Sequence, residues 1–166
     1  MPTFANFGEL EKFLKDKIAN ALENEVAEIV RDHQQTAIED VVYSRYNVVD
    51  GVHQDPYVYE RRRDRGGLSD RHNMIGTIDY TTDGVRLSIE NITKGANSNF
   101  EIAGLIEYGD GWQGKEYEYK RNRDNTAYQY LNPRPFIQTT RDRLRQSGDH
   151  VRSLRDGLIR QGIAVK

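Results

Sequence analysis

Apolar residues recur every three or four positions from Asn6 to about Tyr43, which places them on one stripe of a helix. The stripe consists of Phe7, Leu10, Leu14, Ile18, Leu22, Val26, Ile29, Val30, Ala37, Ile38 and Val41. Asn6 and Glu9 have the spacing of a capping box. A helix over 6–43 would be roughly 57 Å long at ~1.5 Å per residue. We therefore expect it either to bend at residues 32–36, where the stripe is polar, or to extend onto a partner.

The middle of the chain changes to an alternation of apolar and polar residues, which is typical of half-buried strands. We predict strands over 73–81, 85–89 and 102–108, with Asp83-Gly84 as a tight turn between the first two. These strands would form a small antiparallel sheet over 73–108.

A long polar segment, 109–132, follows the predicted sheet. Loops of this length are uncommon inside compact domains and are usually functional. Its tyrosines are Tyr117, Tyr119, Tyr128 and Tyr130. Three interpretations remain open for them: packing over the sheet, a protein interface, where tyrosine is enriched, or a platform on which sugars or bases stack.

The last apolar period predicts a helix over 135–160. Pro135 suits the first helical turn and Gly162 suits a C-terminal cap. The order of long helix, small antiparallel sheet and helix packed on that sheet indicates an α+β fold. The length of 166 residues indicates one domain over 1–166.

The composition points to a thin core. Hydrophobic residues make up 36 % of the chain and charged residues 30 %, against about 45–50 % apolar residues in a typical domain. We expect neighbouring subunits to complete what the chain cannot bury alone. The absence of cysteine excludes disulfides and thiol catalysis, and no apolar run is long enough for a membrane span.

The two predicted helices differ in charge. Residues 6–43 carry nine acidic and four basic side chains, whereas residues 134–160 carry seven arginines and three aspartates. Two interpretations remain open: two solvated faces, or complementary docking within a subunit or around a ring, where charge sets register and partner choice.

Candidate chemistry is sparse, and we expect a protein that is no enzyme and has neither cofactor nor metal. The four histidines, His33, His53, His72 and His150, have no metal-ligand spacing. Neither a phosphate-binding glycine loop nor a nucleophile elbow is present. Asp110 followed by Glu118-Tyr119-Lys120 has the residue types of a metal-dependent nuclease, but matches this short arise by chance in a chain this charged.

A run of arginines offers an alternative function. Arg61, Arg62, Arg63 and Arg65 could contact phosphates through counterion release, with Tyr57 and Tyr59 stacking on bases. The chain would then be a non-specific nucleic-acid-binding module. Glu60 and Asp64 dilute this charge, and the net charge of −2 gives no general attraction to nucleic acid.

Four segments carry a resemblance to a known family. They are Tyr57–Arg62 with Gly66–Asp70, then Ile106–Gly109, Arg134–Ile137, and Val151–Leu158 with Gln161-Gly162. Their order and spacing, spread over most of the chain, resemble the tail-completion (head–tail joining, or neck) proteins of long-tailed bacteriophages. The segment Gly66-Gly67-Leu68 and the long loop 109–132 depart from the wider family pattern.

The resemblance implies a structural virion protein, present in the neck of the particle and in the host cytoplasm during assembly. It implies a homo-oligomeric ring, often a hexamer, between the head connector or adaptor and the tail terminator or tail tube. DNA would only pass through the channel, and no membrane would be involved. From the positions of these motifs we expect Glu107 to pair with Arg134, Phe136 to anchor the last helix on the sheet, and loop 109–132 to dock onto a neighbour or an adjacent ring.

Overall fold

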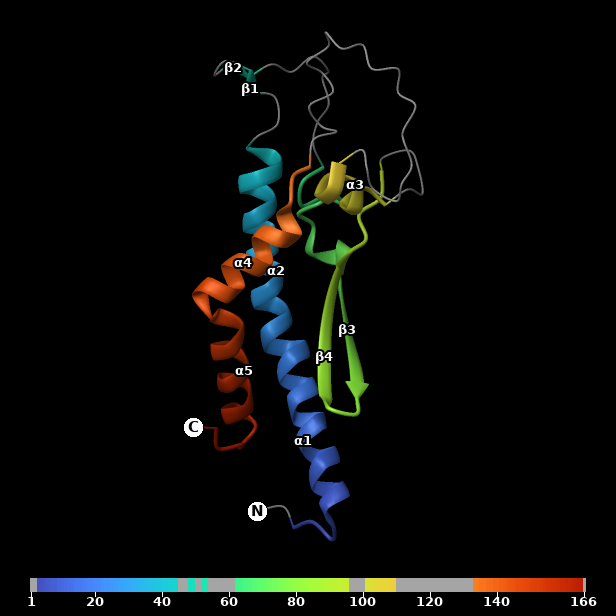
Figure 1. Ribbon diagram of the computed structural model, residues 1–166, viewed down its shortest axis with the longest axis vertical. Helices are drawn as coiled ribbons and strands as arrows, with labels where there is room; N and C mark the ends of the chain where they lie inside the picture. The colour runs from blue at the N-terminus through green and yellow to red at the C-terminus, as the bar shows by residue number, and fades with distance from the viewer. Residues whose placement is uncertain are drawn as a thin grey trace.

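The computed structural model describes residues 3–44, 62–95, 101–109 and 133–165, together with the backbone of two short strands, β1 (Val48–Val49) and β2 (Val52–His53). Its elements stand in three columns, with a long helix in the middle, a β-hairpin on one side and two C-terminal helices on the other (Figure 1). This arrangement confirms the predicted α+β class.

The central column is one continuous helical run, which we call the long helix. It consists of α1 (Phe7–Ala21), the π-helical turn η1 (Leu22–Val26), α2 (Ala27–Ile38) and the π-helical turn η2 (Glu39–Tyr43). Asn6 caps its start, because the Asn6 side chain accepts a hydrogen bond from the Glu9 N–H at 3.0 Å. The predicted helix over 6–43 is confirmed. Its irregularities are the two π turns, and residues 32–36 remain α-helical.

The hairpin pairs β3 (Met74–Thr81) with β4 (Gly84–Asn91) in antiparallel register. Thr81 pairs with Gly84, so the connecting loop is Thr82-Asp83, one residue earlier than the predicted Asp83-Gly84 turn. The first two predicted strands are confirmed. Residues that face the long helix alternate with exposed ones along β4, as expected for a sheet with one solvated face.

The predicted third strand, 102–108, is wrong: these residues form the helix α3 (Ile102–Tyr108). Its buried residues are Ala103 and Glu107, four positions apart, which is a helical period and not a strand period. The sheet therefore ends at Asn91 and does not extend over 73–108. A seven-residue apolar run has no periodicity strong enough to distinguish the two structures.

The predicted single helix over 135–160 is also wrong, because it is divided into α4 (Phe136–Ser147) and α5 (Asp149–Arg160). Gly148 separates them in a left-handed conformation with φ 67°. Its N–H donates to the Leu144 carbonyl at 2.9 Å, which caps α4. The chain then changes direction and α5 runs along the long helix (Figure 1).

Gly162 ends α5 as predicted. Its φ is 82°, and its N–H donates to the Ile159 carbonyl at 2.9 Å. The N–H of Ile163 donates to the Leu158 carbonyl at 3.0 Å. These two bonds together form a Schellman motif, which satisfies the last carbonyls of the helix.

The C-terminal helices pack against the long helix, and α5 lies on the side away from the hairpin. The prediction that the C-terminal helix packs on the sheet is therefore wrong, because the long helix stands between α5 and the hairpin. At Gly157 an added Cβ would lie 3.0 Å from the Ala21 Cβ, so two small residues allow α5 and α1 to approach closely. Arg160 forms an ion pair with Glu25, and Arg143 forms one with Asp40 at 2.7 Å. Of the two interpretations of the helix charges, docking within the subunit is therefore observed for these pairs.

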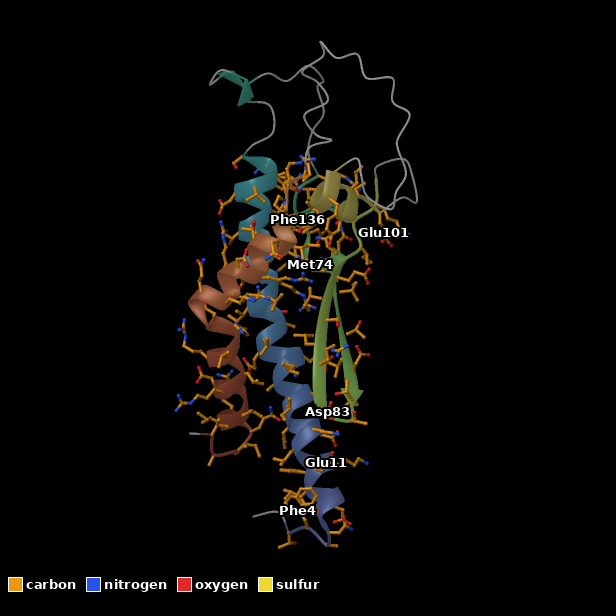
Figure 2. The ribbon with its side chains drawn as sticks, in the orientation of Figure 1. Phe4, Glu11, Met74, Asp83, Glu101 and Phe136 are labelled. Carbon is orange, nitrogen blue, oxygen red and sulfur yellow. The ribbon has the colours of Figure 1, made fainter. Side chains whose placement is uncertain are left out.

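The main cluster of buried apolar residues lies at the C-terminal end of the long helix, and Ala19, Ala21, Val26 and Ala27 are buried further along it. The main cluster consists of Ala37, Ile38, Val42, Leu68, Met74, Ala103 and Phe136. Figure 2 shows Phe136 and Met74 close together at this end, while Phe4 lies at the opposite end. Phe136 is fully buried and joins the start of α4 to the long helix, α3 and the first residue of β3. The predicted burial of Phe136 is confirmed, but α4 is anchored mainly on the long helix and not on the sheet.

Candidate functional site

The two ends of the segment that follows α3 are held together at one base. The Ile106 carbonyl accepts a hydrogen bond from the Arg134 N–H at 2.8 Å. The Glu107 carboxylate accepts hydrogen bonds from the N–H groups of Ile137 at 2.7 Å and Gln138 at 3.0 Å. Glu107 thus caps α4 from another helix, with its negative charge at the positive end of the helix dipole. We call these contacts the loop base.

Glu107 and Arg134, which the motif positions singled out, are both part of the loop base. Both residues were predicted to join two elements, and both contribute to this junction, Glu107 through its carboxylate and Arg134 through its backbone. The pairing of their charges stays a prediction. The four tyrosines expected at an interface, Tyr117, Tyr119, Tyr128 and Tyr130, lie outside the described residues.

The arginine run is engaged with the protein where the structure describes it. Arg62 donates to the Lys94 carbonyl at 2.5 Å. The Arg63 guanidinium lies 3.7 Å from a Glu39 carboxylate oxygen and 5.6 Å from the centre of the Tyr43 ring. Two of the candidate phosphate ligands therefore connect this turn to the rest of the fold.

The other residues of the predicted nucleic-acid site give, where the structure describes them, no further contacts that would bring the arginines together. Arg65 is exposed, and its N–H donates to the Arg62 carbonyl at 2.7 Å within the turn. Arg61 and the two tyrosines proposed to stack on bases, Tyr57 and Tyr59, lie outside the described residues. The geometry thus gives the nucleic-acid alternative no converging cluster among the described arginines.

Two residues whose structural roles were not predicted from the sequence, Gly67 and Asp70, build the turn after the arginines. An added Cβ at Gly67 would lie 2.4 Å from the Arg63 carbonyl oxygen, so no larger residue fits. The Asp70 carboxylate accepts hydrogen bonds from the Gly66 N–H at 2.6 Å and the His72 N–H at 2.9 Å. An aspartate before a turn could have suggested this capping role.

The pKa of Asp70 follows from these contacts. Burial by itself raises it, but the hydrogen bonds from the His72 and Gly66 N–H groups, with the nearby His72 ring, lower it below the ordinary 3.8. A folded-state pKa below the unfolded value stabilises the fold above the unfolded pKa, and this contribution disappears as the pH falls through the folded pKa.

We therefore expect Asp70→Asn to destabilise the protein most near neutral pH. The free-energy difference from the unsubstituted protein should begin to shrink as the pH falls below 3.8, the ordinary pKa of an aspartate. It should disappear below the lower folded-state pKa of Asp70, where the carboxyl is protonated in both the folded and the unfolded chain. Urea unfolding at a series of pH values measures this difference. Asp64→Asn, on an exposed residue of the same turn, is the matched control. If the free-energy difference between Asp70→Asn and the unsubstituted protein grew on acidification, the lowered pKa assigned to Asp70 would be wrong.

The histidines do not converge. His33 on α2 contacts the Asp149 carboxylate at 2.9 Å, which connects the long helix to the start of α5. Hydrogen bonds with Ser147 and His33 lower the pKa of Asp149 below its ordinary value. His72 contacts Asp70 at 3.0 Å. Within the described part of the chain, no group of three or more acidic or histidine residues is placed to hold a metal ion.

The nuclease-like residues Asp110, Glu118 and Lys120 are outside the described residues, so the geometry does not test them. No helix in the ranges that the structure describes is both long and apolar enough to cross a membrane.

An open depression of about 370 Å³ lies between α1 and the tip of the hairpin. It is lined by Gly8, Glu11, Lys12, Lys15, Asp16 and Tyr80. The Lys15 ammonium donates to the carbonyls of Thr81 at 3.0 Å and Thr82 at 3.2 Å, and the Tyr80 hydroxyl donates to Asp16 at 3.3 Å. Desolvation and the Asp16 carboxylate raise the pKa of Tyr80. These contacts attach the hairpin tip to the helix, a structural role.

Comparison with known proteins identifies a family that the chain matches over most of its length. The model of the YomN family matches residues 6–160, which includes the long helix, the hairpin, the loop base and both C-terminal helices. The curated proteins and the solved structures yield no match.

Proposed function

We propose that this chain, which belongs to the YomN family, is a structural ring subunit in the neck of a long-tailed bacteriophage. It would join the head connector or adaptor to the tail terminator or tail tube, and it would perform no catalysis. The segments that resemble tail-completion proteins support this role, since all of them lie within or directly beside the matched range.

The loop base is the observation that carries the proposal. It joins the residues on either side of segment 110–132, next to the main buried cluster. A rigid base allows a long segment to be presented to a partner without weakening the domain beneath it. An adapter between two larger assemblies needs such a segment, because it must bind neighbours on more than one side.

The core supports the same role. Its main cluster is small and lies at one end of the long helix, while several large apolar side chains are exposed among the described residues, including Phe7, Tyr108 and Val151. A ring subunit can cover such residues with identical neighbours. The nucleic-acid alternative receives less support, because Arg62 and Arg63 already contact Lys94 and Glu39.

Loss of the gene tests the proposal directly. Cells that carry the phage without it should accumulate filled heads and free tails, visible by electron microscopy. Supplying the intact chain from a plasmid should restore joined particles that contain it in the neck. Joined particles in the absence of the chain would contradict the proposed role.

Replacement of residues 111–131 by a short glycine–serine linker should abolish joining and leave the domain folded. The Ile106–Arg134 and Glu107 contacts remain in this variant, so we expect the free energy of unfolding to change by less than about 1 kcal/mol. Complementation measures joining, and urea unfolding measures stability. A folded variant that still joins heads to tails would show that segment 110–132 is not needed for docking.

A further inference from the structure

The β3–β4 hairpin is a two-stranded sheet with two edges. Within the described residues, the backbone–backbone bonds of the two strands run between the strands themselves, and the long helix is the main element packed on them. A lone hairpin is marginally stable, and an eight-residue edge strand presents unpaired N–H and C=O groups with which another strand can pair. β3 has only one charged residue, Asp79, and no proline, so it lacks the usual protection of an edge.

The register shows which backbone groups face outward. Thr81 pairs with Gly84 across a two-residue loop, and at the other end the Ile92 N–H donates to the Asn73 carbonyl at 2.8 Å. Antiparallel pairs alternate, so the odd-numbered residues of β3 bond to β4 and the even-numbered ones point to the free edge. The contact of the even-numbered Met74 fits this alternation. Its carbonyl accepts a hydrogen bond from Arg31 at 3.1 Å instead of from β4.

The free edge of β3 therefore presents the N–H and C=O groups of Gly76, Ile78 and Tyr80. By the same alternation, the free edge of β4 presents those of Val85, Leu87 and Ile89. The two edges are equally long and complementary, and they lie on opposite sides of the same hairpin.

We propose that β3 of one copy pairs antiparallel with β4 of the next copy, so that the hairpins form a continuous sheet around the ring. This inference rests on the proposed function and specifies the contact that would build the ring. The contact is heterologous, since two different edges meet, and a contact of this kind produces a closed ring when the rotation between copies closes.

Charge complementarity favours a second copy of this chain as the partner of the free strand edges. The register between copies would be the same as that between β3 and β4 within one hairpin. On the solvent face, Asp79 pairs with Arg86 within the hairpin. In the same register, Asp79 would also lie opposite Arg86 of the next copy. Opposite charges would then alternate around the ring, and like charges would never be neighbours.

This register also keeps the apolar side chains on one face of the sheet, and it gives adjacent copies a separation that suits packed helices. Ile78, Leu87 and Ile89 would all remain on the side that faces the helices. Strands lie about 4.8 Å apart, so each hairpin adds about 10 Å to the sheet. Packed helices are about 8–10 Å apart, so the long helices of adjacent copies would also come into contact.

Disulfide cross-linking tests the pairing, and the natural chain contains no cysteine to interfere. Thr77 and Ser88 are exposed residues that would face each other between copies as a non-hydrogen-bonded pair, a geometry that suits a disulfide. One chain carries Thr77→Cys and a second carries Ser88→Cys. After mild oxidation we expect a covalent dimer from the equimolar mixture and none from either variant alone.

The controls define the outcomes that would overturn the proposal. Arg155→Cys, exposed on α5, should not cross-link to Thr77→Cys. A dimer from Thr77→Cys alone or from Ser88→Cys alone would show like edges pairing. Preference of Thr77→Cys for Glu90→Cys over Ser88→Cys would show another register. Circular dichroism of each variant confirms that the chains tested are folded.

Sedimentation of the unsubstituted protein separates the two proposals. A ring without the Thr77–Ser88 cross-link would overturn the strand pairing and leave the proposed function standing. A protein that stays monomeric at high concentration would overturn the strand pairing as well, whereas the neck role would still depend on the gene-loss experiment.

Discussion

Phe136→Ala should lower the free energy of unfolding by about 3–5 kcal/mol. Phe136 is fully buried among residues of the long helix, α3 and the start of β3. Truncation removes its apolar contacts and leaves a cavity that the surrounding helices cannot fill. Because Phe136 is the first residue of α4, the cavity should loosen α4 first. Urea unfolding, monitored by circular dichroism, measures the change.

The matched control is Val151→Ala. Val151 is 60 % exposed on α5, and we expect a change within about 0.5 kcal/mol. Equal effects of the two substitutions would show that Phe136 is not a core residue. Phe136→Leu, which retains most of the apolar volume, should give an intermediate loss.

Glu107→Ala should have the second-largest effect, a loss of about 2–3 kcal/mol. Glu107 is 5 % exposed, and its carboxylate accepts the hydrogen bonds of two backbone N–H groups at the start of α4. Alanine leaves both donors buried without a partner and removes a negative charge from the helix N-terminus. Urea unfolding gives the loss, and hydrogen exchange at Ile137 and Gln138 shows whether the first turn of α4 opens.

Two variants make this prediction specific. Glu107→Gln keeps one carbonyl oxygen as an acceptor, so it should retain part of the stability. Glu101→Ala changes an exposed glutamate that directly precedes α3 and should be nearly neutral. If Glu107→Ala were as mild as Glu101→Ala, the loop base would not depend on this carboxylate.

The elements predicted correctly are those with long, regular patterns. The long helix has eleven apolar positions over ten turns, and the β4 strand alternates over its full length. Patterns of that length leave one secondary structure that can bury the apolar side chains. Gly162 was predicted correctly for a similar reason, because a glycine just after a helical period has an established capping role.

The two incorrect elements depended on contacts that a local pattern does not contain. Residues 102–108 fit a strand and a helix equally well, and the surroundings of Ala103 and Glu107 decide for the helix. The helix over 135–160 has an unbroken period across Gly148, so the interruption was not visible in the apolar residues. It follows from the left-handed backbone at Gly148, which turns α5 back along the long helix.

The candidate site was predicted unevenly. Glu107, Arg134 and Phe136 were identified because motif positions pointed to them, and all three meet near the loop base or in the core beside it. The roles of Gly67 and Gly157 were missed, because close approach of two segments leaves no mark in the sequence besides a glycine. Asp70 was missed as well, although its position before a turn carried a weak signal.

The amino-acid sequence by itself determined the α+β class, the extent of the long helix, the presence of the hairpin, and the opposite charges of the first and last helical segments. Those properties depend on side-chain periodicity and composition, which are local. Only the tertiary structure decided that α5 lies against α1 through Gly157, that Glu107 caps a helix from another element, and that no other described strand pairs with either edge of the β3–β4 hairpin. These depend on which distant segments meet, and that choice belongs to packing of the whole chain.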